Sequence, residues 1–157
     1  MALIHEILYK STDLKRIDFG NYIKTLADDL YHTYVIDTNL IELNVKVDDL
    51  MLDINTSIPL GLIVNELVTN SLKHAFPGGN TGKIDINFHL QDDKYQLEVK
   101  DNGIGFPKNI DYKNSDFLGL RLVTSLTEQI DGVIEFINTS GTSFKIIFAE
   151  EKFNENI

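Results

Sequence analysis

The sequence of 157 residues contains no cysteine. This absence excludes disulfide bonds, zinc sites built on thiolates and cysteine nucleophiles, and it fits a cytoplasmic location. The chain also lacks any apolar run near the ~20 residues that a membrane-spanning helix needs. Its first ten residues, MALIHEILYK, do not have the basic start of a secretory signal. We therefore expect no direct membrane contact.

Basic residues are also scarce, since 14 Lys and Arg stand against 24 Asp and Glu for a formal net charge of −10. Such an acidic chain argues against a general surface for nucleic acid. An anionic ligand would need backbone amides and a few well-placed cations at its own site. The length predicts one domain with its own hydrophobic core.

The clearest feature that is present is an amphipathic helix, expected at residues 58–76 (IPLGLIVNELVTNSLKHAF). Its apolar residues recur at helical spacing, which leaves Glu66, Asn70 and Lys73 on a narrow opposite stripe with His74 at its margin. These polar residues can be simply the solvated face of the helix. Asparagine is unfavourable inside a helix, however, which favours a functional stripe. Glu66 could orient a water or hydroxyl, Asn70 could bind Mg²⁺, and Lys73 could meet a phosphate.

The remaining periodicity predicts two helices and two hairpins around this helix. Thr56 or Ser57 is expected to cap it, and the Pro-Gly-rich residues 77–80 are expected to end it. The polar residues 108–117 are the best candidate for a mobile lid. The other predicted elements are helices at 19–34 and 119–130, a strand at 40–47, a short extended piece at 52–54, and hairpins pairing 82–90 with 95–100 and 133–137 with 142–149.

A glycine-containing segment, DNGIGFP at residues 101–107, follows the second strand of the first hairpin. Gly103 and Gly105 would let a ligand lie against bare backbone. A Gly-x-Gly pair by itself is equally typical of an ordinary turn after a strand. The residues alone therefore establish only that Asp101 stands at a strand end beside a glycine loop.

Three segments nevertheless occur in a specific order: NELVTNSLKHAF at 65–76, DNGIGF at 101–106 and GLRLV at 119–123, followed by GTSF at 141–144. This set resembles the ATP-binding domain of sensor histidine kinases, in the GHKL superfamily shared by gyrase, heat-shock chaperone ATPases and mismatch-repair ATPases. The resemblance covers roughly residues 20–150. It implies an α/β (α+β) two-layer sandwich, with helices on one face of a mixed, largely antiparallel sheet.

The resemblance also implies a division of the chain. Residues 1–14 are expected to be a remnant of the second helix of a dimerisation and phosphoacceptor domain. Residues 15–150 would form the ATP-binding catalytic domain, and 151–157 a polar tail. His5 does not lie in a complete phosphoacceptor helix, so the phosphorylated histidine is expected outside this fragment.

The resemblance further implies ATP and Mg²⁺ as cofactors, with Glu66 and Asn70 as the catalytic residues. Asn70 would chelate Mg²⁺ and Glu66 would orient the nucleophile. Lys73 would contact phosphate and His74 would lie near the ribose. The other expected nucleotide-site residues are Asp101 as acceptor for the adenine amino group, Gly103 and Gly105 under the lid, Gly119 and Leu120 as the second glycine box, and Thr142 beside adenine. In contrast to the commonest kinases, only one glycine, Gly119, precedes Leu120.

The implied function is transfer of the γ-phosphoryl group of ATP to a histidine in two-component signalling. The implied partners are ATP, the phosphoacceptor helix of the parent kinase and a response regulator. Two alternatives stay open at this point. One is an ATP-hydrolysing domain of the same superfamily, with Glu66 activating water. The other is a non-catalytic nucleotide-binding regulatory module.

Overall fold

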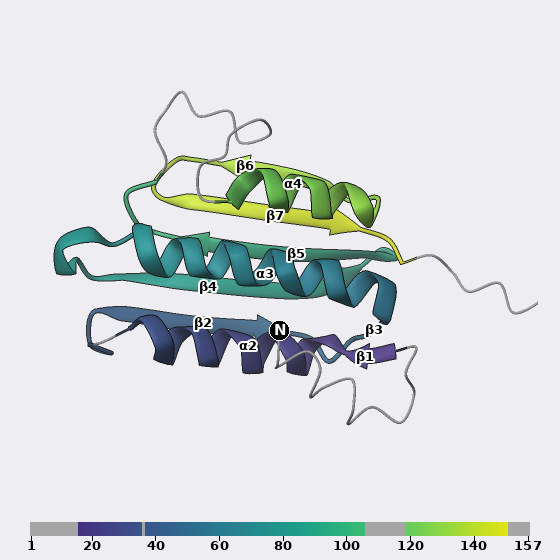
Figure 1. Ribbon diagram of the computed structural model, residues 1–157, viewed down its shortest axis with the longest axis horizontal. Coiled ribbons are helices and arrows are strands. Elements are labelled where there is room, and N and C mark those ends of the chain that lie inside the picture. Colours follow the sequence, from purple (N-terminus) through teal and green to yellow (C-terminus); the bar gives the residue numbers. More distant parts are fainter. Residues whose placement is uncertain (1–15, 36, 106–118, 151–157) are drawn as a thin grey trace, which may run out of the picture.

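The computed structural model describes residues 16–35, 37–105 and 119–150. The predicted helix remnant at 1–14, the lid at 108–117 and the tail at 151–157 lie outside this part of the chain. The described elements are, in order, β1 (Arg16–Asp18), α2 (Phe19–Tyr34), β2 (Ile41–Val47), β3 (Met51–Asp53), α3 (Ile54–His74), a 3₁₀ turn (Pro77–Gly79), β4 (Gly82–Gln91), β5 (Lys94–Asp101), α4 (Leu120–Gln129), β6 (Val133–Ile137) and β7 (Thr142–Phe148) (Figure 1).

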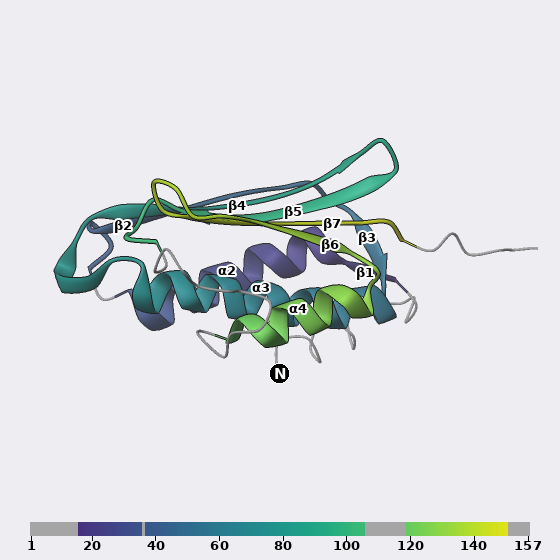
Figure 2. The ribbon, with the colours of Figure 1, turned by 90° about the horizontal axis from the view of Figure 1, so that it is seen from above.

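The elements form two layers, which confirms the predicted sandwich. One layer is a five-stranded sheet in the order β2-β4-β5-β7-β6, and the other consists of α2, α3 and α4 on a single face of that sheet (Figure 2). The β2–β4 pair is parallel and the other three pairs are antiparallel. Among the described residues, no helix is both long and apolar enough to cross a membrane.

The sheet order follows from the connections. Parallel strands need a long crossover, and α3 supplies it between β2 and β4. The next two strands, β4 and β5, join through a tight hairpin. Its two central residues, Asp92 and Asp93, have φ of 52° and 63°, the left-handed backbone that a two-residue hairpin turn requires.

The hydrophobic core lies between the layers. Alternate residues of β4, β5 and β7 face the helices and are buried, whereas their neighbours lie on the open face of the sheet. Helix α3 packs against α2 on one side and α4 on the other, which explains why its apolar face is so broad. The core residues of α3 are Leu60, Ile63, Val64, Leu67, Val68 and Leu72.

The start of α3 differs from the prediction. The helix begins at Ile54, and the side chain of Asp53 caps it by accepting from the Thr56 N–H at 2.8 Å. The expected cap at Thr56 or Ser57 is therefore wrong. Aspartate is among the preferred N-cap residues, and it reaches the free amides one turn earlier. Pro59 consequently lies inside the helix rather than in its first turn.

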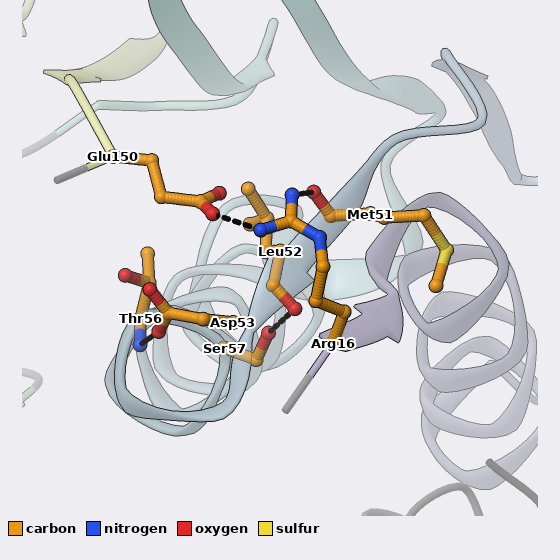
Figure 3. A network of polar contacts seen from close by, with 7 residues as sticks. All are labelled: Arg16, Met51, Leu52, Asp53, Thr56, Ser57 and Glu150. Atoms are coloured by element: carbon orange, nitrogen blue, oxygen red, sulfur yellow. Dashed lines mark hydrogen bonds and ion pairs between the residues drawn. The ribbon is translucent and has the colours of Figure 1, made fainter. Parts of the chain in front are cut away.

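Strand β1 is not among the elements that the sequence pattern predicts. Arg16–Asp18 pairs antiparallel with β3, and only its central residue, Ile17, is buried. Three residues are too few to show a period in sequence. Arg16 adds side-chain bonds at 2.6 Å to the Glu150 carboxylate and to the Met51 carbonyl (Figure 3). These bonds join β1 and β3 to the segment that follows β7.

Candidate functional site

The candidate site lies where β5 ends beside the C-terminal half of α3. Asp101 is the last residue of β5 and stands opposite Thr142, the first residue of β7. Ser71, on α3, contacts Asp101 from the helix layer. One buried carboxylate therefore joins both layers of the fold at one end of the sheet.

The carboxylate of Asp101 is held by several hydrogen bonds. One oxygen, Oδ2, accepts from the Ser71 hydroxyl at 2.7 Å, and Oδ1 accepts from the Gly103 N–H at 2.9 Å. The residue is only 5% exposed. Burial raises the pKa of Asp101 above its usual value, and bonds from Ser71, Gly103 and the Thr142 backbone partly oppose that rise. The arrangement presents a fixed hydrogen-bond acceptor at the end of the sheet.

Ser71 is a site residue that the sequence reasoning missed. It lies on the buried side of α3 between Val68 and Leu72 and is 8% exposed. The helix pattern gave that side only apolar residues and no role to Ser71. The available signal was a serine inside a helix on an apolar face, where a buried hydroxyl needs a partner.

The two glycines that follow Asp101 are each required by the fold, for different reasons. A Cβ on Gly103 would lie 2.3 Å from the Ala75 carbonyl oxygen, so this glycine lets the loop pack against the end of α3. The Ile104 N–H donates to the same carbonyl at 3.0 Å. Gly105 has φ of 74°, and a Cβ there would lie 2.6 Å from the Asn138 side-chain oxygen. Both positions therefore require glycine before any ligand is considered.

A second cluster forms between α3 and the start of α4. Gly119 caps α4 with φ of 72°, and a Cβ on it would lie 2.4 Å from a carboxylate oxygen of Glu66. Glu66 thus lies beside the free amides that begin α4. Leu120 is 1% exposed and its side chain belongs to the core, so it can offer a ligand only backbone groups.

The other residues of the predicted stripe lie along the same helix. Asn70 is half-buried one turn after Glu66, whereas Lys73 and His74 are exposed. The Lys73 ammonium lies over the ring of Tyr34 on α2, 5.3 Å from the ring centroid. A contact between Lys73 and phosphate therefore requires this ammonium to leave the aromatic ring.

Protein groups that could hold a metal are few. No cluster of three or more His, Asp or Glu side chains with the geometry for a metal occurs within residues 16–35, 37–105 and 119–150. Mg²⁺ in nucleotide sites typically keeps several waters and uses one or two protein oxygens plus phosphate oxygens. A single amide oxygen from Asn70 suits that role, but not the role of a metal cage built from protein alone.

Residues 55–152 of the chain match the family described as "Histidine kinase-, DNA gyrase B-, and HSP90-like ATPase". Residues 1–34 match a second family, described as "Histidine kinase". The first match includes β5, α4, β7 and all of α3 except its first residue, and it contains every residue of the candidate site named above from Glu66 to Thr142.

Individual relatives agree with these matches. Blue-light-activated histidine kinase 2 of Erythrobacter litoralis is 31% identical over 120 residues, which are 76% of this chain and 34% of the relative. Sensor histidine kinase PdtaS of Mycobacterium tuberculosis is 30% identical over 135 residues, 84% of this chain and 26% of the relative. The chain thus spans about a third or less of these two relatives.

Among solved structures, the EL346 blue-light activated histidine kinase of Erythrobacter litoralis superimposes with a TM-score of 0.84 at 27% identity. The superposition covers 96% of this chain and 51% of that one. The family match, the relatives and the fold agree with the resemblance that the ordered sequence segments carry. The chain belongs to the family of histidine kinase-, DNA gyrase B- and HSP90-like ATPases, as an ATP-binding domain of the histidine kinase type.

Proposed function

We propose that this chain binds ATP with Mg²⁺ and is the catalytic domain of a sensor histidine kinase. In this proposal it transfers the γ-phosphoryl group to a histidine outside the chain, and the phosphoryl group then passes to a response regulator. The observation that carries the proposal is the buried, hydrogen-bonded carboxylate of Asp101 at the end of β5. The family match and the two kinase relatives support it.

Asp101 would select the base. An ionised carboxylate only accepts hydrogen bonds, so it suits the exocyclic amine of adenine and repels the carbonyl oxygen of guanine. Its neighbour Thr142 lies directly across the strand pair and is 8% exposed. The bare backbone of Gly103 completes this part of the site, since its N–H fixes one carboxylate oxygen.

The other end of the site would hold the phosphates. Asn70 would supply an oxygen to Mg²⁺, which neutralises phosphate charge when bound. Glu66 lies beside the start of α4, where its carboxylate can orient an attacking group and the helix amides can receive an anion. Lys73, released from Tyr34, would add a cation next to the phosphates of the nucleotide. Phosphoryl transfer depends mainly on such positioning and charge neutralisation.

Calorimetric titration tests the nucleotide site. ATP should bind in the presence of Mg²⁺, GTP should bind at least tenfold more weakly, and chelation of Mg²⁺ should weaken ATP binding. Equal affinities for ATP and GTP would contradict the assignment of Asp101. Failure of both nucleotides to bind would overturn the proposed function.

Labelled ATP distinguishes a kinase from a hydrolase. The chain alone should show no acid-labile phosphate and only slow ATP turnover, because the proposed phosphoacceptor histidine lies outside it. Addition of a protein that supplies the phosphoacceptor histidine should give labelling of that histidine. Steady turnover of ATP by the chain alone, abolished by Glu66→Gln, would instead favour an ATP hydrolase.

A further inference from the structure

Two buried serines on α3 use their hydroxyl groups differently. Ser57, at the start of the helix, donates to the backbone carbonyl of Leu52 at 3.4 Å. Ser71, near its end, donates to the Asp101 carboxylate at 2.7 Å, although 30 residues separate the two in sequence. The Ser57 hydroxyl thus bonds to a backbone carbonyl close to it in sequence, whereas the Ser71 hydroxyl bonds to the residue that is proposed to select the base.

The bond from Ser71 is the side-chain contact that supports Asp101 from the helix layer. From the described residues, the other bonds to this carboxylate come from backbone, namely the Gly103 N–H in the following loop and the Thr142 N–H on β7. These three groups face the carboxylate from the elements around it, and among the described residues no charged side chain contributes to its pKa shift. Within the part of the chain that the structure describes, Asp101 is thus a buried carboxylate supported by hydrogen bonds.

We propose that Ser71 is a positioning residue for Asp101, whose hydroxyl fixes the carboxylate in one orientation and favours its ionised form. Ser71 thereby sets the pH below which the site stops accepting a hydrogen bond from an exocyclic amine. The inference rests on the proposed ATP site and extends it to a residue that does not itself need to contact the base.

The physical reason is the balance between burial and hydrogen bonding. A carboxylate that is 5% exposed loses most of its solvation, which favours the neutral acid. A hydroxyl that donates to the ionised form opposes that loss. A protonated Asp101 would carry a donor on one oxygen and lose part of its capacity to accept from an amine. Removing the Ser71 hydroxyl should therefore raise the pKa of Asp101 further and let the carboxylate rotate.

The direct test is the titration of the Asp101 carboxyl carbon by NMR in the nucleotide-free chain. Ser71→Ala should move the midpoint upward by about one pH unit, as expected for the loss of a hydrogen bond to a charged group. Ser57→Ala is the matched control, because it removes a buried hydroxyl from the same helix away from Asp101, and should leave the midpoint unchanged. Ser71→Thr retains a hydroxyl and should restore the wild-type midpoint.

The second measurement is ATP affinity between pH 4 and 8, an interval of about four units chosen to span carboxyl titration. ATP affinity should fall in every variant as the pH is lowered. In Ser71→Ala this fall should begin at a pH about one unit higher than in wild type. Titration of the phosphates of ATP is common to all variants and cancels in the comparison. At a pH within that interval, Ser71→Ala should lose roughly tenfold in ATP affinity and discriminate less against GTP.

The outcomes separate this inference from the proposed function. An unchanged Asp101 midpoint in Ser71→Ala overturns the inference, even if the variant has a lower melting temperature. If wild-type chain binds no nucleotide, the proposed function fails, while the NMR midpoint still decides whether Ser71 controls Asp101. If Ser71→Thr does not fold, the comparison of the two alanine variants alone decides the result.

Discussion

The substitution Asp101→Asn should abolish most of the adenine-dependent affinity while the fold stays intact. The amide has nearly the same shape as the carboxylate, and it can keep one oxygen for the Gly103 N–H while Ser71 turns to accept from the new NH₂ group. The variant thus loses an ionised acceptor and places a donor toward the amine of adenine. A hydrogen bond to a charged group contributes about 1.5–3 kcal/mol. At about 1.4 kcal/mol per factor of ten, ATP affinity should fall roughly ten- to a hundredfold.

The same substitution should make the protein more stable, relative to wild type, as the pH rises. Because burial raises the pKa of Asp101 in the fold, this residue favours the folded state below its unfolded pKa near 3.8. That contribution disappears as the pH rises through the raised folded pKa. Asparagine does not titrate, so the free energy of unfolding of Asp101→Asn should gain relative to wild type as the pH rises through this interval.

Calorimetry at neutral pH and urea unfolding at several pH values check both expectations. Asp85→Asn is the matched control, because Asp85 is a half-buried aspartate on β4 that accepts from the Asn44 side chain at 3.2 Å, away from Ser71. The control should bind ATP like wild type. Near wild-type ATP affinity in a folded Asp101→Asn variant would refute the assignment of Asp101 as the base-selecting residue.

Three further predictions concern the metal, the loop and the strand β1. Asn70→Ala should remove most of the Mg²⁺-dependent part of ATP affinity, and an equal effect of chelator on variant and wild type in calorimetry would contradict this. Gly103→Ala places a Cβ within 2.3 Å of the Ala75 carbonyl and should lower the free energy of unfolding by about 1–3 kcal/mol in urea titrations. Arg16→Gln should lose the ion pair with Glu150, whose carboxylate is largely buried, and lower stability by about 1 kcal/mol without changing ATP affinity. Weaker ATP binding by Arg16→Gln would contradict this expectation and would show that the two ends of the sheet are energetically coupled.

The sequence by itself determined most of the regular structure. Helix α2 was predicted at its observed bounds, and the strands of both hairpins were predicted to within a residue or two. Their periods are repeated several times, so local pattern was sufficient. The failures were short or terminal features, namely β1 and the Asp53 cap of α3. Three residues contain no measurable period, and several polar residues in a row can each serve as a cap.

The sequence also supplied the members of the candidate site, but only the tertiary structure decided which of them meet. The ordered segments named Asp101, Glu66 and Gly119 without stating any distance. The fold places Glu66 against Gly119 and joins Asp101 to Ser71, a residue to which the helix pattern gave no role. Periodicity shows which face of a helix is apolar, whereas a buried hydrogen bond depends on the strand that lies opposite. That partner is set by sheet order and by the packing of α3 across β5, which no local stretch of sequence contains.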